Sequence, residues 1–170
     1  VGNNKGRDYK LLIEIVKAMP EYKFCIISSN SALNLLANFD NVELIKGNWS
    51  DSSLSDLDIK DYYKQAKLTI LPVDDTIVAS GQSVTLQSIA AGTPVMISNT
   101  KGFWDKDLFR NKKEIYFVEN SDAKEWKEKI EETLNEEDLL LEISKNGNSL
   151  VKKYFNLDSF SEGFLELINS

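Results

Sequence analysis

Histidine is absent from this chain of 170 residues, and cysteine occurs only once. Without histidine the chain lacks the commonest general base, which excludes a Ser-His-Asp or Cys-His mechanism within it. A single cysteine cannot form an intramolecular disulfide, which is typical of proteins from a reducing compartment. Because Cys25 lies in the apolar run of residues 24–27, we expect a small buried side chain rather than a reactive thiol.

Positive charge and long apolar runs are also scarce. The 20 lysines and arginines are outnumbered by 27 aspartates and glutamates, which gives a formal net charge of -7. Nucleic-acid-binding domains are normally basic, so we expect no nucleic-acid partner. No apolar run is long enough to span a bilayer, and no signal peptide is visible. These absences favour a cytoplasmic protein.

What the sequence does contain is a regular alternation of helical and extended patterns. Apolar residues recur at helical spacing in residues 8–19, whereas residues 23–28 form a short continuous apolar run typical of a strand. By the same criteria we expect strands at 42–45, 68–73, 95–98 and 114–118, and helices at 31–39, 57–66, 82–91, 104–109, 122–134, 136–154 and 157–168. This alternation predicts a single α/β domain over residues 1–170, a doubly wound parallel sheet with helices on both faces.

Polar loops follow several of the predicted strands, at 28–31, 46–50, 72–83 and 98–102, and another opens the chain at 2–7. In a doubly wound sheet the ligand binds outside the carboxyl ends of the strands. The small and polar residues of these loops therefore predict a binding crevice at that edge.

One of these loops ends in Gly81, and a helix is predicted to start at Gln82. The first N–H groups of a helix lack intrahelical partners and its dipole favours an anion, so a phosphate could bind there. Gly81 would let the phosphate approach the backbone, Ser83 could add a hydroxyl donor, and Gln87 lies one turn further on the same face. In the alternative interpretation, Ser80 is an ordinary N-cap and Gln87 faces solvent.

Common nucleotide-binding and hydrolase motifs are missing from this loop. The chain contains neither the G-x-G-x-x-G dinucleotide fingerprint nor the G-x-x-x-x-G-K-[ST] P-loop. Residues 81–85 read GQSVT and lack the second glycine of a G-x-S-x-G nucleophile elbow.

Four stretches of the chain resemble one enzyme family in the right order. Residues 1–14 read VGNNKGRDYKLLIE, residues 42–48 read VELIKGN, residues 62–72 read YYKQAKLTILP, and residues 71–98 read LPVDDTIVASGQSVTLQSIAAGTPVMIS. Together they are similar to the C-terminal donor-binding half of GT-B glycosyltransferases, in particular the large retaining family four. The resemblance extends from Val1 to about Leu134 and implies the Rossmann-like half of a GT-B enzyme.

The resemblance implies roles for residues around the predicted helix start. Ser83 and Val84 fall where the family offers backbone N–H groups to the donor diphosphate, and Gln87 falls on a glutamate that binds the ribose. Ala79 falls on the family's other glutamate, near the donor sugar, and cannot do the work of a carboxylate. Gly81 stands one place before the family's glycine, so the turn is expected to differ in shape.

The first loop carries the basic side chains that the resemblance assigns to the donor phosphates. Lys5 falls on the family's phosphate-binding lysine, and Gly2 falls on the first glycine of the loop. The family's arginine falls on the uncharged Asn3, and Arg7 could stand in for it with a permanently charged, bidentate guanidinium. Lys5 and Arg7 could instead be surface cations, each paired with a neighbouring acid.

No metal ion and no separate cofactor are expected. The resemblance implies that cationic side chains and helix N-termini stabilise the leaving diphosphate. Asp74 and Asp75 are adjacent acids in a loop and are more simply explained as solvated. The implied substrate is a nucleotide-diphospho-sugar such as a UDP- or GDP-sugar.

The resemblance therefore implies the donor-binding domain of a glycosyltransferase that transfers a hexose to a glycan, lipid or small molecule. We expect a fragment that lacks the N-terminal acceptor domain, is inactive in isolation, and would meet a membrane only through the missing part. No catalytic side chain is assigned. The alternative is a catalytically inactive Rossmann-like binding or interaction module, which Ala79 would suit. A sugar-nucleotide epimerase would need acid-base residues that the chain does not show.

Overall fold

Helices and parallel strands alternate along the chain in its computed structural model, which describes residues 2, 6–47, 54–119 and 122–169. The helices of this part are α1 (Tyr9–Ala18), the 3₁₀ helix η1 (Ser31–Asn38), α2 (Asp56–Gln65), α3 (Gln82–Ala90), α4 (Ala123–Asn135), α5 (Glu137–Tyr154) and α6 (Leu157–Asn169). The predicted order of elements is confirmed, except that residues 104–109 form turns and bends instead of a short helix.

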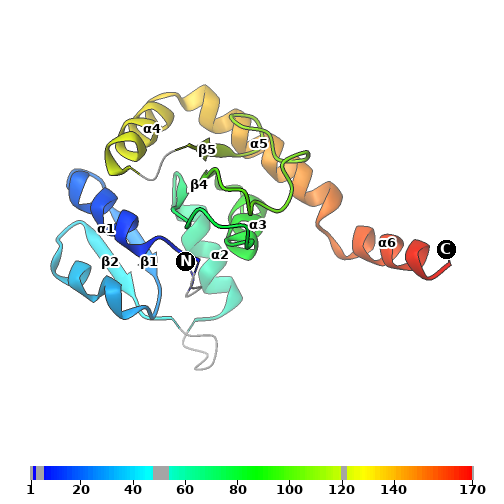
Figure 1. Ribbon diagram of the computed structural model, residues 1–170, viewed down its shortest axis with the longest axis horizontal. Coiled ribbons are helices and arrows are strands. Elements are labelled where there is room, and N and C mark those ends of the chain that lie inside the picture. The colour runs from blue at the N-terminus through cyan, green and yellow to red at the C-terminus, as the bar shows by residue number, and fades with distance from the viewer. Residues whose placement is uncertain (1, 3–5, 48–53, 120–121, 170) are drawn as a thin grey trace.

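The strands of the described chain form two parallel sheets flanked by helices (Figure 1). One sheet pairs β1 (Phe24–Ile27) with β2 (Val42–Ile45), and the other has the order β3 (Thr69–Leu71), β4 (Val95–Ser98), β5 (Tyr116–Val118). The predicted α/β class, with parallel strands between layers of helices, is confirmed. Because the strands of each sheet are parallel, their carboxyl ends lie at one edge.

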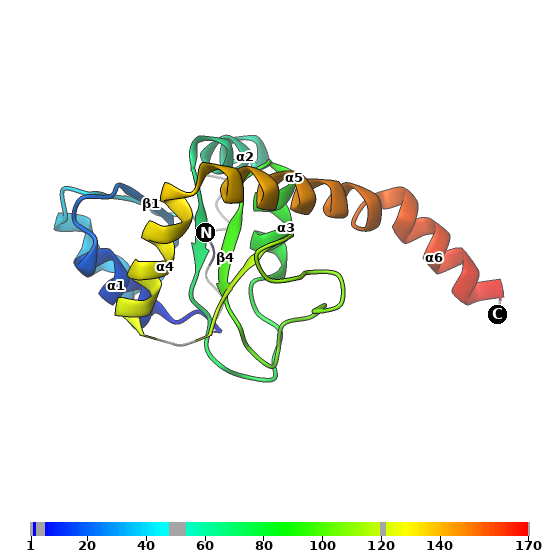
Figure 2. The ribbon, with the colours of Figure 1, turned by 90° about the horizontal axis from the view of Figure 1, so that it is seen from above.

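β4 is buried along its whole length between two layers of helices (Figure 2). Val95 and Ile97 belong to a core that contains side chains of α2, α3 and α5, whereas Met96 belongs to a core with side chains of α1 and α4. Successive residues of a strand face opposite sides of the sheet, so one continuous apolar run serves two cores. β4 therefore anchors the strands whose carboxyl ends carry the loops of interest.

The sheet of β1 and β2 is covered differently. Ile26 packs against Val16 of α1 and against Leu33 and Leu36 of η1. Cys25, which points to the opposite face, is exposed. The prediction of a buried Cys25 is wrong, because an apolar run does not reveal how completely each face of its sheet is covered.

α5 holds the C-terminal end of α3. Asn148 donates from Nδ2 to the carbonyl oxygens of Ile89 at 2.9 Å and Ala90 at 3.1 Å, and Ser144 donates to that of Gly92 at 2.7 Å. The last carbonyls of a helix lack intrahelical partners, so these side chains complete α3. With one end held, α3 presents its N-terminus in a fixed position beside the carboxyl end of β3.

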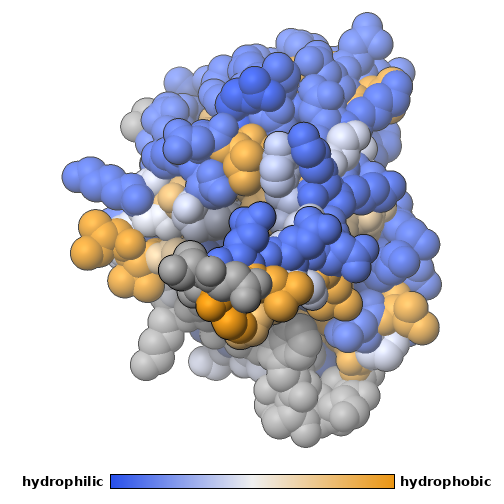
Figure 3. All heavy atoms as spheres, turned by 90° about the vertical axis from the view of Figure 1, so that its right-hand side faces the viewer, coloured by the Kyte–Doolittle hydropathy of each residue, from blue (hydrophilic) through white to orange (hydrophobic). Residues whose placement is uncertain are grey.

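α6 extends away from the sheets (Figures 1 and 2). Its exposed apolar side chains are Leu157, Phe160, Phe164, Leu165 and Ile168. Figure 3, which views the molecule from this side, shows apolar side chains among hydrophilic ones. Within the described residues, no helix combines the length and the apolar character needed to cross a membrane.

Gly147 of α5 tests the packing that holds α3. A Cβ at this position would lie 2.7 Å from the carbonyl oxygen of Glu114 and 3.1 Å from Cγ2 of Ile89. We predict that Gly147→Ala lowers the free energy of unfolding by about 1–3 kcal/mol, because a backbone oxygen cannot move aside easily.

The matched control is Gly163→Ala in α6, where a Cβ would meet nothing within 4 Å. This change should leave the stability unchanged or raise it slightly, since alanine favours a helix. Urea unfolding followed by circular dichroism measures both variants, and equal midpoints would contradict the packing described here.

Candidate functional site

The N-terminus of α3 has no side-chain cap. Gly81 occupies the N-cap position with a left-handed φ of 89°, and the amide of Thr85 donates to the carbonyl oxygen of Gly81 at 2.9 Å. Because no described side chain caps the helix, its first amides keep their capacity to donate to a ligand. The alternative interpretation, with Ser80 as the N-cap, is wrong: the cap position belongs to Gly81.

The segment that carries Arg7 is fixed against the end of β3. Arg7 forms an isolated antiparallel bridge with Val73, and the amide of Asp8 donates to the carbonyl oxygen of Pro72 at 3.2 Å. The carboxylate of Asp8 caps α1 by accepting from the amide of Leu11 at 2.8 Å. The acid next to Arg7 in the sequence is therefore engaged at a helix end.

The guanidinium of Arg7 lies between two glycines with left-handed backbones. A Cβ on Gly81 would lie 2.9 Å from Nη1 of Arg7 and 2.8 Å from Cδ2 of Leu71. A Cβ on Gly2, whose φ is 115°, would lie 3.4 Å from Nη2 of Arg7. Glycine adopts these dihedral angles without strain, and at Gly81 it also leaves room for the guanidinium. Segments far apart in the sequence thus meet around one cation.

The charge of Arg7 is uncompensated within the part of the chain that the structure describes. Its Nε and Nη1 atoms are buried without a hydrogen-bond partner, and no described carboxylate forms an ion pair with it. Burial lowers the pKa of the guanidinium, while the neighbouring Tyr9 and Tyr63 raise it. An arginine nevertheless stays charged in proteins, and an unpaired buried charge is costly. This place therefore favours the binding of an anion.

Other buried polar atoms without a hydrogen-bond partner gather around the same helix end. They are Oγ of Ser80, Oγ1 of Thr85 and the hydroxyl of Tyr63; in the rest of the described chain only the hydroxyl of Tyr116 shares this property. Each such group costs about 1–3 kcal/mol, so their concentration is typical of a binding site. The sequence pattern does not single out Tyr63 or Thr85, because both lie in helices among core residues.

The structure brings together four of the predicted site residues: Gly2, Arg7, Gly81 and Val84. Ser83 is exposed on the first turn of α3, and Gln87 is half-buried one turn further. Lys5 lies outside the described residues. Asp74 and Asp75 are exposed, and no group of three acids or cysteines suited to a metal ion occurs among the residues described.

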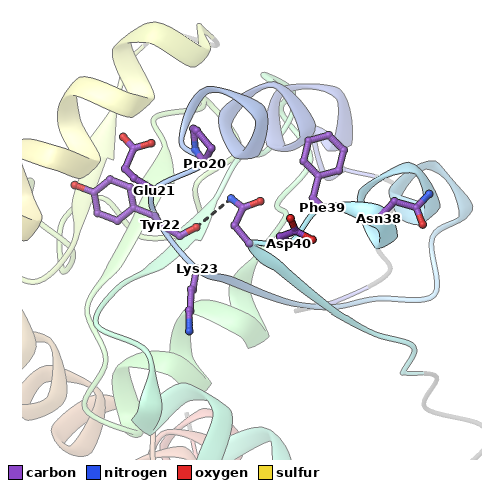
Figure 4. A pocket seen from close by; sticks show the side chains of 8 residues that line it. Pro20, Glu21, Tyr22, Lys23, Asn38, Phe39 and Asp40 are labelled. Carbon is purple, nitrogen blue, oxygen red and sulfur yellow. Dashed lines mark hydrogen bonds between the residues drawn. The ribbon is translucent and has the colours of Figure 1, made fainter.

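A separate hollow of about 570 Å³ lies between the turn after α1 and the turn before β2 (Figure 4). Asn41 donates from Nδ2 to the carbonyl oxygens of Met19 and Tyr22, which ties the two turns together. The hollow lies at the amino ends of β1 and β2, whereas ligands of parallel sheets bind at the carboxyl ends. We assign no function to it.

Comparison with known proteins identifies the family of the chain. Residues 4–150 match the family described as "Glycosyl transferases group 1", a stretch that covers most of the chain and contains both Arg7 and α3. The chain belongs to this family. A search among curated proteins finds no match to this group 1 glycosyl transferase.

Solved structures share the fold of this group 1 glycosyl transferase. A glycosyltransferase from Rickettsia africae ESF-5 has a TM-score of 0.74 at 16% identity, over 96% of this chain and 44% of that one. The C-terminal domain of LpcC, a group 1 family protein from Francisella tularensis, has a TM-score of 0.68 at 17% identity, over 92% of this chain and 84% of that one.

HepE from Anabaena, in complex with UDP, has a TM-score of 0.76 at 12% identity, over 98% of this chain and 46% of that one. At these identities the likeness establishes the fold. The chain spans less than half the length of the Rickettsia and Anabaena proteins.

Gly81 offers a test of how closely Arg7 and Leu71 surround the N-terminus of α3. We predict that Gly81→Ala destabilises this group 1 glycosyl transferase by at least about 1 kcal/mol more than Gly92→Ala. Both glycines have left-handed backbones, with φ of 89° and 92°, so both changes carry the conformational cost of about 1–2 kcal/mol.

The two positions differ in their surroundings. A Cβ on Gly81 would meet Arg7 and Leu71 at less than 3 Å, whereas a Cβ on Gly92 would meet nothing within 4 Å. Urea unfolding of the two variants measures the cost of crowding by Arg7 and Leu71 together, and an equal loss of stability in both would show that these side chains do not crowd the Cβ position of Gly81.

Proposed function

We propose that this group 1 glycosyl transferase domain binds a nucleotide-diphospho-sugar, such as a UDP- or GDP-sugar, with the diphosphate between the N-terminus of α3 and Arg7. The observation that carries the proposal is the buried guanidinium of Arg7, uncompensated among the described residues and held between Gly2 and Gly81. The uncapped amides at the start of α3 complete a site that needs an anion.

The remaining predicted residues extend this site. The backbone amides of Ser83 and Val84 and the hydroxyl of Ser83 would face phosphate oxygens, and Lys5 would add a second cation. Gln87, half-buried one turn along α3, would bind the ribose through its amide group. Support for a nucleotide also comes from the solved structures of HepE, which include complexes with UDP and with UDP-glucose.

The proposed chemistry is electrostatic. When the bond between the sugar and the diphosphate breaks, negative charge develops on the leaving phosphate oxygen. The guanidinium of Arg7 and the dipole of α3 would stabilise that charge because they are fixed before the reaction begins. No separate cofactor, metal ion or acid-base side chain of this chain is needed for that role, and no catalytic residue is assigned.

We place this domain as the C-terminal half of a retaining, family four enzyme with the GT-B fold. The acceptor, whether a glycan, lipid or small molecule, would be held by an N-terminal domain outside residues 1–170. The chain spans less than half of the Rickettsia and Anabaena proteins, which supports this division into two domains. In isolation the domain would bind donor and transfer nothing. In the whole enzyme we expect a cytoplasmic location, with membrane contact only through the other domain.

One observation favours a second candidate, a binding module without catalytic activity. Ala79 is exposed two residues before Gly81 and offers no carboxylate to a donor sugar. Such a module would retain the anion site but lose the sugar contact, so it would bind UDP and a UDP-sugar with equal affinity.

Calorimetric titration of UDP into the chain tests the proposal. We predict that Arg7→Gln weakens UDP binding by about 10-fold or more, because a hydrogen bond to a charged group is worth about 1.5–3 kcal/mol. Arg7→Lys should retain part of the affinity, since it keeps the charge and loses the fork.

The control is Lys145→Gln, which removes the same charge from an exposed position of α5. It should bind UDP as the wild type does. If Lys145→Gln weakens UDP binding as much as Arg7→Gln does, the loss of affinity comes from the change in net charge and not from the position of Arg7. If the wild type binds no nucleotide, the proposed donor site is refuted.

A further inference from the structure

Ser98 is the last residue of β4, and its side chain is a polar group in apolar surroundings. It is 4% exposed. Met96, two residues earlier, belongs to the core with side chains of α1 and α4, so Ser98 faces the same side of the sheet. An alanine would pack there without the cost of burying a hydroxyl, so the hydroxyl of Ser98 needs a partner.

That partner is the backbone of the segment that follows β3. Oγ of Ser98 accepts a hydrogen bond from the amide of Val73 at 3.0 Å, and the bond is buried. The parallel pairing of β3 with β4 ends at Leu71 and Ile97, so the amide of Val73 lies beyond the last backbone pair of the two strands. The side chain of Ser98 thus continues the connection between β3 and β4 past the end of their ladder.

Val73 is also the residue against which the backbone of Arg7 is held. The two residues face each other in an antiparallel bridge, and the side chain of Val73 is buried. The hydrogen bonds of this bridge join the amide of Asp8 to the carbonyl oxygen of Pro72 at 3.2 Å and the amide of Asp74 to that of Gly6 at 3.1 Å. Val73 therefore connects β4, through its amide, with the segment that carries Arg7.

The position of this segment determines where the guanidinium lies. Nη1 of Arg7 is 2.9 Å from the Cβ position of Gly81 at the N-terminus of α3. Its Nε and Nη1 atoms have no hydrogen-bond partner among the described residues, so no such bond at these atoms fixes the side chain. A shift of the bridge between Arg7 and Val73 would consequently move the charge relative to the first amides of α3.

We infer that Ser98 is a positioning residue for Arg7: its hydroxyl fixes the amide of Val73 to β4, and the bridge with Val73 fixes the backbone of Arg7 beside the N-terminus of α3. Because both main cores pack on β4, this hydroxyl connects the candidate site to the centre of the packing. The effect on donor binding rests on the proposed function, whereas the hydrogen bonds that carry the inference do not.

Hydrogen exchange of backbone amides, followed by NMR, tests this connection without any ligand. Ser98→Ala removes the acceptor, so we expect the amides of Asp8 and Asp74 to exchange about 5-fold faster or more, because the bridge opens more often. Unchanged exchange of these two amides in folded Ser98→Ala would overturn the inference. Ser98→Cys offers only a weak acceptor, so it should show a smaller increase, and it replaces Ser98→Ala if that variant does not fold.

The matched control is Ser88→Ala, which also removes a buried hydroxyl. Ser88 lies on α3 and forms hydrogen bonds with Oγ1 of Thr69 at 2.8 Å and with the carbonyl oxygen of Thr93 at 3.1 Å, at the amino ends of β3 and β4. We expect it to lower the urea midpoint and to leave the amides of the bridge unchanged. If both variants speed these amides equally, the cause is a general loss of stability and Ser98 has no positioning role.

The consequence for donor binding is tested by a mutant cycle with UDP as the probe. Ser98→Ala should weaken UDP binding about 3- to 10-fold in the wild-type background and have no further effect in the Arg7→Gln background. Ser88→Ala should bind UDP as the wild type does. An equal loss in both backgrounds would refute a role of Ser98 through Arg7. If the wild type binds no UDP, the proposed function fails, while the exchange measurement still decides whether Ser98 holds the bridge.

Discussion

The buried charge of Arg7 is the constraint on which the candidate site depends. Taking a guanidinium out of water without a partner costs several kcal/mol, and among the described residues no carboxylate offsets that cost. The carboxylate of Asp8 is engaged at the cap of α1, so it does not neutralise the guanidinium. Such an arrangement costs stability when no ligand is bound, and this cost is what the proposed diphosphate-binding role would explain.

The rest of the fold fixes the positions of the segment that carries Arg7 and of the N-terminus of α3. β4 is buried between two cores, α5 closes the C-terminal end of α3, and backbone contacts fix the segment of Arg7 against β3. Gly2 is held as well, since its amide donates to the carbonyl oxygen of Ile27 and its own oxygen accepts from Ser28. A site whose donors are fixed in advance needs no rearrangement when charge develops on a ligand, which is the condition for electrostatic stabilisation of a leaving group.

The sequence predicts the architecture well and the site only in outline. Apolar periodicity and the glycine after β3 are local signals, so they locate the strands, α3 and its N-terminus. The burial of the Arg7 side chain and of the Tyr63 hydroxyl depends on contacts between segments that are far apart in the sequence. From the sequence alone, Arg7 could equally be a cation on the surface and Tyr63 an ordinary aromatic residue of the core. The prediction that Cys25 is buried was wrong for a related reason, because its exposure depends on which helices cover β1. Lys5 lies outside the described residues, so its predicted role stays a prediction.

The central claim, that the charge of Arg7 is kept for an anion, is tested most directly by unfolding the wild type and Arg7→Met in urea, with and without pyrophosphate. Without the anion, Arg7→Met should be at least as stable as the wild type, because an apolar side chain replaces an unpaired buried charge. With pyrophosphate, only the wild type should gain stability, in proportion to the ligand concentration over its dissociation constant. A variant that is clearly less stable without the anion, and gains as much as the wild type with it, would contradict the claim.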